Sequence, residues 1–498
     1  MNEQPSSQNL SVSPIQLSFA FAKSHGVMLQ GDNKILYFQI PSLVTLQELR
    51  RLLGQALHFE KISQEHFEEL LVQHYQARSE QSLDMLEGFS EDADLQDLVN
   101  HLPETEDLLE SDNDAPIISL INAILREAIK ANASDVHIET YEQKLSIRFR
   151  IYGMLREILS PPRTIAPLIV SRIKVMSKLD IAEKRLPQDG RITLKIAGRN
   201  IDVRVSTLPG SHGERVVLRL LDKKNAPLDL RSLGMSQFTL NSLEKIISKP
   251  HGIILVTGPT GSGKSTTLYA ILTQLNDGKK NILTVEDPIE YYFPGIGQTQ
   301  VNYKIDMTFA KGLRAILRQD PDVVMIGEIR DLETAKIAVQ ASLTGHLLLS
   351  TLHTNTATGA IARLKDMGVE SFLLASSLSG LIAQRLIRLL CPTCKKAIIP
   401  DKEISEFFAV AKMPIPNTVY EPQGCENCYQ TGYKGRAGIY DLIIIDDKIR
   451  AMIHENSSEQ DIENYARQDY PGLRQDGLRL VTEGRTSCEE IIRVTTED

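Results

Sequence analysis

The stretch "GIILVTGPTGSGKSTTLYAILTQL", residues 252–275, decides the fold class of the C-terminal part of this chain. It starts as an apolar run typical of a buried strand, passes through a glycine-rich turn and continues as a helix-like segment. The turn, "GPTGSGKST" at 258–266, fits the pattern G-x-x-x-x-G-K-S/T, in which main-chain N–H groups surround the phosphates of a nucleotide. Because strand, turn and helix occur together, we interpret it as a phosphate loop and not as a chance glycine-rich turn.

The residues of this phosphate loop are candidates for contact with ATP. Lys264 is expected to reach the β- and γ-phosphates, and the hydroxyl of Ser265 is expected to bind Mg²⁺. The start of the following helix would add N–H groups and the positive end of the helix dipole. The complete candidate set is Gly258, Pro259, Thr260, Gly261, Ser262, Gly263, Lys264, Ser265 and Thr266.

Further apolar runs, separated by helix-like segments, predict a parallel sheet with crossover helices in an α/β fold. They are "NILTVED", "DVVMIGE" and "GHLLLSTL", and the polar residues around their ends include Glu286, Asp287, Glu290, Glu328, His346 and His353. Ligands of open α/β sheets bind beyond the carboxyl ends of the strands, so we expect these groups to gather near the γ-phosphate. A lone histidine is more often an ordinary hydrogen-bonded residue. For two histidines in one polar cluster we favour phosphate sensing or coordination, without a metal.

Four segments of this region resemble the Walker A, Asp, atypical Walker B and His boxes of the secretion ATPases that assemble type II secretion pseudopili and type IV pili. They are "GPTGSGKST", "LTVEDPIEYY", "DPDVVMIGEIRD" and "LTGHLLLSTLHT". The resemblance, to the GspE/PilB family, implies a RecA-like ATPase domain. Most phosphate-loop proteins end the Walker B strand in Asp. In this chain the first carboxylate is Glu328, one residue later, after Gly327, and the family resembled here also ends this strand in Gly-Glu. We expect Glu328 to polarise the attacking water or to hold Mg²⁺ through water, with Glu286 sharing the catalytic work.

Residues 115–222 combine a helical pattern with short alternating strands, which predicts a compact α+β domain. Four of its segments, "ASDVHIE", "KRLPQDGRI", "DVRVSTLPG" and "GERVVLRLLDK", resemble the PAS-like domain that packs over the nucleotide in the same family. Taken singly, each arginine here is most often a solvated surface residue. The resemblance nevertheless implies that Arg191, Arg204 and Arg215, and less directly Arg219, contact nucleotide within or across subunits. This chain has Tyr152 in "IYGML", where the family usually has an Asp-Gly turn.

The first part of the chain carries no recognisable chemistry. Residues 1–85 contain short apolar runs and two helix-like segments, which predict a small N-terminal domain. Residues 86–114 are strongly acidic, with no Lys or Arg between Arg78 and Arg126. Such a run is usually a solvated linker, and the alternative is a segment that orders on a partner.

Cysteines are few and paired. Cys391 and Cys394 form one C-x-x-C pair, and Cys425 and Cys428 form a second about thirty residues later. Four thiolates complete a tetrahedral zinc shell, so we predict a structural Zn²⁺ in an arm at 391–433, inserted in the ATPase domain at 223–498. The alternatives are four ordinary reduced thiols or a redox pair. Cys488 stands apart as a core thiol.

The bulk composition narrows the function classes. At 498 residues, 42% hydrophobic and 24% charged, the sequence predicts an ordinary soluble protein of about two to four domains. The net charge of −9 and the absence of Trp argue against direct nucleic-acid binding. We expect no secretory signal and no membrane span, because apolar windows are interrupted by charge before ~18 residues.

The resemblance further implies a cytoplasmic homo-oligomer, in this family a hexamer, which hydrolyses ATP to power pseudopilus assembly and protein export. Its N-terminal domain, here 1–85, docks on the cytoplasmic part of the inner-membrane protein GspL, and the platform protein GspF is a second partner. Contact with the membrane is then indirect. "LSFAFAKSHGV" at 17–27 favours the type II secretion members. The alternatives are a type IV pilus assembly or DNA-uptake ATPase, a nucleic-acid motor, and a zinc-ribbon scaffold without activity.

Overall fold

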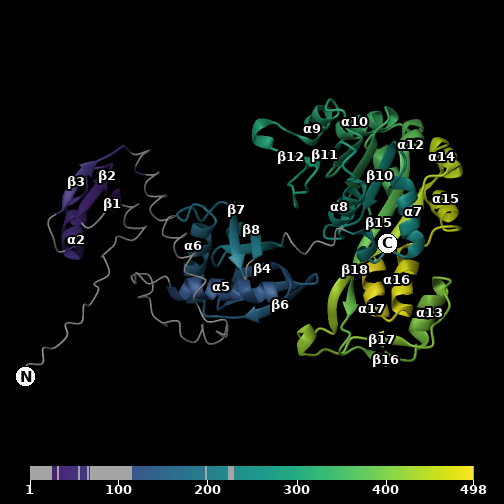
Figure 1. Cartoon of the computed structure of the whole chain (residues 1–498). Coiled ribbons are helices and arrows are strands. Elements are labelled where there is room, and N and C mark those ends of the chain that lie inside the picture. The colour runs from purple at the N-terminus through teal and green to yellow at the C-terminus, as the bar shows by residue number, and fades with distance from the viewer. Residues whose placement is uncertain are drawn as a thin grey trace, which may run out of the picture. The chain divides into compact units, whose positions relative to one another are not determined.

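A computed structural model describes residues 25–30, 33–53, 57–63, 67, 115–196, 199–222 and 229–496. The predicted acidic linker, 86–114, lies outside the described residues, as does much of 1–85. The chain divides into two compact units at Asp222 and Lys223 (Figure 1). Among the described residues, no helix combines the length and the apolar composition that crossing a membrane requires.

The N-terminal described segment is a small α/β element. Strands β1 (Val27–Gln30) and β2 (Lys34–Tyr37) pair antiparallel, and β3 (His58–Lys61) pairs parallel to β2. Helix α2 (Leu43–Leu53) packs on them through Leu49, which joins Val27 and Ile35 in a small core.

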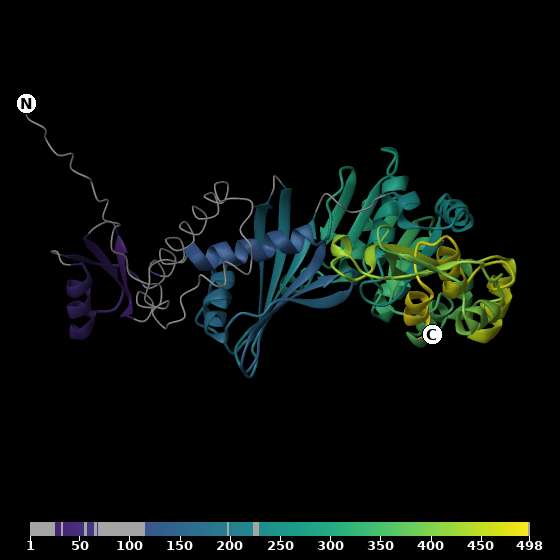
Figure 2. The ribbon, with the colours of Figure 1, turned by 90° about the horizontal axis from the view of Figure 1, so that it is seen from below.

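Residues 115–222 form an antiparallel sheet in the order β6-β5-β4-β9-β8-β7. The strands are β4 (Ala133–Thr140), β5 (Leu145–Ile151), β6 (Met154–Leu159), β7 (Gln188–Ile196), β8 (Arg199–Leu208) and β9 (Arg215–Asp222). Helices α5 (Ala115–Lys130) and α6 (Ala166–Met176) cover the apolar face, and Figure 2 shows α5 lying across the sheet. Tyr152 and Gly153 both have positive φ, 49° and 89°, as the tight turn between β5 and β6 requires.

The C-terminal unit is the predicted α/β fold. Its seven-stranded sheet has the order β12-β11-β13-β14-β10-β15-β18 and is parallel except for β18. The strands are β10 (Gly252–Thr257), β11 (Ile282–Glu286), β12 (Ile296–Gln300), β13 (Val323–Ile326), β14 (Leu347–Leu352), β15 (Leu378–Leu390) and β18 (Tyr433–Ile444). Strands β10, β13 and β14 are buried along their whole length, because helices cover both faces of the sheet.

Two hydrophobic cores lie on the two faces of this sheet. Alternate residues of β10 enter different cores, with Ile253 and Leu255 in one and Ile254 and Val256 in the other. Helices α7 (Gln237–Ile247) and α8 (Lys264–Leu275) cover one face. Helices α9 (Phe309–Ile316), α10 (Leu332–Leu343), α11 (Gly359–Asp366) and α12 (Ser371–Ser377) contribute to the other core. The short 3-10 turns η4 (Leu230–Leu233) and η5 (Tyr303–Ile305) lie before α7 and α9.

An arm leaves the sheet after β15 and returns as β18, as the cysteine spacing predicts (Figure 1). It contains the antiparallel pair β16 (Lys396–Ile398) and β17 (Val419–Glu421), with α13 (Lys402–Val410) between them. Phe408 of α13 and Val419 of β17 are buried in the same core as the sheet. Helices α14 (Asp447–His454), α15 (Glu459–Ala466), α16 (Leu473–Thr482) and α17 (Cys488–Thr495) complete the unit, and Cys488 is a buried core thiol as predicted.

Candidate nucleotide site and four-cysteine cluster

The phosphate loop has the predicted strand–loop–helix setting, between the end of β10 and the start of α8. Gly258 and Gly263 have φ of 142° and 89°, which a side chain would strain. A Cβ at Gly258 would lie 2.4 Å from the main-chain oxygen of Gln384, so only glycine fits there. After Gly263 the chain enters the first turn of α8. The N–H groups of this turn have no intrahelical partner, so they can bind an anion.

Lys264 is folded back onto the phosphate loop. Its Nζ donates hydrogen bonds to the main-chain oxygens of Gly258 and Pro259, at 2.7 and 3.1 Å. The side chain is only 9% exposed, and this burial lowers the pKa of Lys264 to about 8. Glu328 opposes that shift and Arg385 adds to it, so both charged groups lie near the amine. A bound phosphate would replace the carbonyl oxygens as partner of this amine.

Strand β15 pairs with β10 and carries two buried residues near the phosphate loop that the sequence analysis did not identify. Gln384 is 2% exposed, and its Oε1 accepts a hydrogen bond from Thr267 of α8 at 2.8 Å. Arg385 is also buried and donates to the main-chain oxygen of Asn355 at 3.0 Å. The sequence around these residues holds no motif, because only the pairing of β15 with β10 brings them to the loop.

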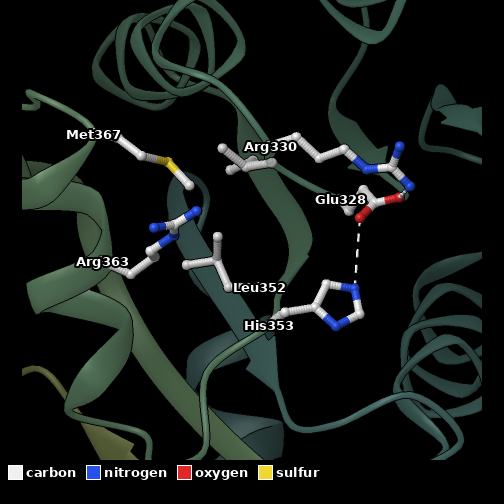
Figure 3. A pocket seen from close by; sticks show the side chains of 7 residues that line it. Glu328, Arg330, Leu352, His353, Arg363 and Met367 are labelled. Atoms are coloured by element: carbon white, nitrogen blue, oxygen red, sulfur yellow. Dashed lines mark hydrogen bonds and ion pairs between the residues drawn. The ribbon is translucent and has the colours of Figure 1, made fainter.

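Glu328 lies at the carboxyl end of β13, as predicted, and contacts one cation and one imidazole ring. Arg330 donates to Glu328 at 2.5 Å, and Nε2 of His353 lies 3.5 Å from the other carboxylate oxygen (Figure 3). Burial, and then the charge of Lys264, lower the pKa of His353, which keeps the ring neutral at pH 7. Glu328 and His353 thus meet beside the lysine of the phosphate loop.

A cavity of about 220 Å³ opens at this cluster (Figure 3). Two of its lining residues, Arg330 and Arg363, are cations that the sequence analysis missed. Arg330 was visible in "GEIRD", whereas Arg363 comes from α11 and is brought here only by the fold. The lining residues are Glu328, Ile329, Arg330, Leu352, His353, Arg363 and Met367.

Glu286 is in a different environment from Glu328. It ends β11 but is only 3% exposed. One carboxylate oxygen accepts from the hydroxyl of Tyr269, and the other accepts from Thr284 at 2.6 Å and from the Gln298 amide at 3.0 Å. Both oxygens are therefore engaged in holding the end of the strand. A catalytic part for Glu286 stays a prediction, and the neighbouring Asp287 is exposed.

The structure contradicts the role predicted for His346. Strands β10 and β14 run parallel, with Gly252 opposite Leu347, so His346 lies at the end of the sheet opposite the phosphate loop. Strand β14 has six residues, which places His346 about 20 Å from the carboxyl end at ~3.3 Å per residue. Its Nδ1 lies 2.8 Å from the main-chain oxygen of Ala341. It is the ordinary hydrogen-bonded histidine of the alternative reading.

The four cysteines of the arm come together as predicted. Their sulfur atoms lie within 4.8 Å of one another, although about thirty residues separate the two pairs. Three of the Sγ–Sγ distances are 3.9 Å (Cys391–Cys425), 3.8 Å (Cys394–Cys428) and 3.7 Å (Cys425–Cys428). A tetrahedral zinc with Zn–S bonds of ~2.3 Å requires sulfurs about 3.8 Å apart. The donor set and its spacing fit structural zinc.

The predicted arginines of residues 115–222 share the polar face of their sheet. Arg191, Arg204 and Arg219 lie directly opposite one another on β7, β8 and β9. Arg219 also pairs with Asp135 at 3.0 Å, and Arg215 pairs with Glu139. This face is the reverse of the apolar face that α5 and α6 cover, so the sheet gathers several guanidinium groups on one side. Contact with nucleotide remains a prediction.

Comparison with known proteins gives a family and several relatives. Residues 110–493 match the family described as "Type II/IV secretion system protein", and residues 16–75 match a domain described for "GSPII protein E". The chain is 58% identical to "Type II secretion system protein E" of Aeromonas hydrophila and 56% identical to "Type II secretion system ATPase E" of Vibrio cholerae serotype O1, in each case over 97% of both chains. Among solved structures it is similar to the pilus retraction motor PilT with bound ADP. That likeness has 28% identity and a TM-score of 0.52, and it covers 75% of this chain and 96% of that chain.

Proposed function

Since the chain belongs to the type II/IV secretion system protein family, we propose that it is an ATPase that hydrolyses ATP to ADP and phosphate to power type II protein secretion. The observation that carries this proposal is that Glu328 lies close enough to Lys264 of a complete phosphate loop to act on the pKa of its amine, at the carboxyl ends of β13 and β10, the two parallel strands on either side of β14. The relatives that align over nearly the whole chain have type II secretion names. This favours secretion over the pilus-assembly and DNA-uptake alternatives.

The phosphate loop binds the triphosphate of ATP. Its N–H groups and the start of α8 surround the β-phosphate, and the ammonium of Lys264 turns from its carbonyl partners to the β- and γ-oxygens. Ser265 is the residue placed to hold Mg²⁺. The ion, when bound, neutralises charge that develops on the transferred phosphoryl group. Thr267 of α8 donates a hydrogen bond to Gln384 of β15, and this bond holds the start of α8 against the strand.

Glu328 orients and polarises the water that attacks the γ-phosphate. It has only 15% of its side chain exposed, and His353 and Arg330 hold its two oxygens. Neutral His353 can accept or donate a proton at this position, beside the phosphate that leaves. Glu286, with both oxygens engaged, supports the Asp-box segment from which Asp287 and Glu290 extend.

The test of this proposal is Glu328→Gln, which keeps the size and removes the charge. Turnover should fall at least about a hundredfold, the lower end of what a general base supplies, while nucleotide affinity changes little. Glu333→Gln is a matched control, because Glu333 is an exposed carboxylate nearby on α10 that pairs with Arg314 at 2.7 Å. Turnover by Glu328→Gln that equals the turnover of the control would refute the assignment.

The arginine face of residues 115–222 contacts the nucleotide in the assembled homo-oligomer, which is a hexamer. Support comes from the row of Arg191, Arg204 and Arg219 and from the suitability of guanidinium groups for phosphate. Arg191→Ala, Arg204→Ala and Arg215→Ala should each lower ATPase activity without releasing zinc. Activity that stays at the wild-type level in all three would refute this part.

The N-terminal segment, 1–85, binds the cytoplasmic part of GspL, and GspF is a second partner, so the protein is cytoplasmic and attached to the inner membrane indirectly. The match of residues 16–75 to a domain described for GSPII protein E supports this. The four cysteines bind Zn²⁺, as their sulfur spacing supports. Co-purification of the full chain, and of a chain that begins after residue 85, with the cytoplasmic part of GspL tests the assignment of residues 1–85 to this partner. Equal capture of both chains would refute it.

A further inference from the structure

The segment 353–358, which we call the histidine loop, follows β14 and begins with His353. Three elements of the sheet hold it. The hydroxyl of Thr257, the last residue of β10, donates to the main-chain oxygen of Thr356 at 3.2 Å. Arg385 of β15 donates to the main-chain oxygen of Asn355 at 3.0 Å, and His353 contacts Glu328 of the β13 end.

A fourth contact comes from the C-terminal helices. Glu459 is the first residue of α15, and its Oε1 accepts hydrogen bonds from the hydroxyls of Thr356 at 2.8 Å and Thr358 at 3.1 Å. Thr358 is 1% exposed, whereas Glu459 is exposed to solvent, so the carboxylate reaches from the surface to a buried hydroxyl. One carboxylate oxygen therefore ties two positions of the histidine loop to a helix about a hundred residues further along the chain.

The same contact fixes the start of helix α11. The N–H of Gly359, the first residue of α11, donates to the hydroxyl of Thr356 at 2.9 Å. That hydroxyl in turn donates to Glu459. Helix α11 carries Arg363 into the cavity beside Glu328 and His353. Glu459 thus restrains two of the side chains that line the cavity, although it does not line the cavity itself.

We propose that Glu459 is a positioning residue for ATP hydrolysis, which holds the histidine loop and the start of α11 and so keeps His353 beside Glu328, facing the γ-phosphate. The inference rests on the proposed function. Without Glu459, the hydroxyls of Thr356 and Thr358 lose their shared acceptor, and the loop gains freedom where small displacements of catalytic groups cost much rate. Binding of ATP depends mainly on the phosphate loop, which Glu459 does not contact. The chemical step should therefore suffer and binding should not.

The experiment compares steady-state ATP hydrolysis by the full-length oligomer and its variants. Glu459→Ala should lower kcat about tenfold and leave KM for ATP within about twofold. Glu459→Gln should recover kcat to within about threefold of wild type, because the amide oxygen accepts the same hydrogen bonds. The matched control is Glu463→Ala, one turn along α15, since Glu463 pairs with Arg467 at 3.0 Å and not with the histidine loop. Its kcat should stay at the wild-type value.

A second variant tests the contact from the loop side. Thr358→Val keeps the shape of the side chain and removes the donor, so its kcat should fall as well. When it is combined with Glu459→Ala, the two effects should not add, because they remove the same hydrogen bond. This variant also decides the matter if Glu459→Ala does not fold.

The results that would overturn the inference are specific. An active wild type with equal kcat for Glu459→Ala and Glu463→Ala overturns it, as do additive effects in the double variant. Equal losses of kcat in Glu459→Ala and Glu459→Gln also overturn it, because they show a dependence on charge and not on the hydrogen bond. A wild type that hydrolyses no ATP would instead overturn the proposed function, and this inference with it.

Discussion

Raising the pH from 7 to 9 should weaken nucleotide binding about tenfold, because burial sets the pKa of Lys264 at about 8. The amine is charged below this pH and neutral above it. Only the charged form attracts the β- and γ-phosphates. Because Lys264 is buried on the phosphate loop, loss of its charge should directly lower the affinity of the protein for nucleotide.

The magnitude follows from the fraction of charged lysine. With a pKa of about 8, that fraction is about nine-tenths at pH 7 and about one-tenth at pH 9, and the apparent Kd is the intrinsic Kd divided by the competent fraction. The pH dependence of folding stability has the opposite sign to that of nucleotide affinity. The folded pKa lies below the ordinary value of 10.5, so between about 8 and 10.5 the unfolded chain binds more protons than the folded chain. Stability of the empty protein from this group therefore rises with pH across that window.

Equilibrium binding of a fluorescent ATP analogue at constant Mg²⁺, between pH 6.5 and 9.5, measures this effect. Lys264→Arg is the control, because guanidinium stays charged throughout this range. Its Kd should not depend on pH, whatever its absolute value. A wild-type Kd that stays constant up to pH 9.5, or that has the same pH dependence as Lys264→Arg, would refute the reasoning.

Three further predictions concern other parts of the same unit. His353→Asn should lower kcat at least about tenfold, whereas His346→Asn should change it less than about twofold, because His346 lies at the opposite end of the sheet; equal losses in an ATPase assay would contradict this placement. Tyr269→Phe removes a buried hydrogen bond to Glu286. It should lower the free energy of unfolding of this unit by about 1–3 kcal/mol in a urea titration. An unchanged denaturation midpoint would contradict this. Elemental analysis of the purified protein should find one zinc per chain. Cys428→Ser should lose most of this zinc and still bind nucleotide. Full zinc retention by the variant would count against the four-sulfur site.

The phosphate loop was predictable because its function is local. Gly258, Gly263 and Lys264 are close in sequence, and a strand before them and a helix after them are visible as hydrophobic patterns. The parallel sheet followed in the same way from apolar runs that are buried on both sides. The cysteine pairs were also predictable, because two C-x-x-C motifs with four identical ligands leave few other arrangements. Glu328 was identified by its place after an apolar strand.

What only the tertiary structure decided is which groups lie beside that loop. Gln384 and Arg385 have no local signal, and they reach the loop because β15 pairs with β10. His346 and His353 look equivalent in sequence, yet six residues of extended strand carry them to opposite ends of the sheet. Glu286 and Glu328 both follow apolar strands in the sequence, and only the fold shows that Tyr269 and Gln298 donate hydrogen bonds to the carboxylate of Glu286. Sequence specifies local backbone geometry and residue type, whereas the burial and the partners of a side chain depend on strands paired far apart in the chain.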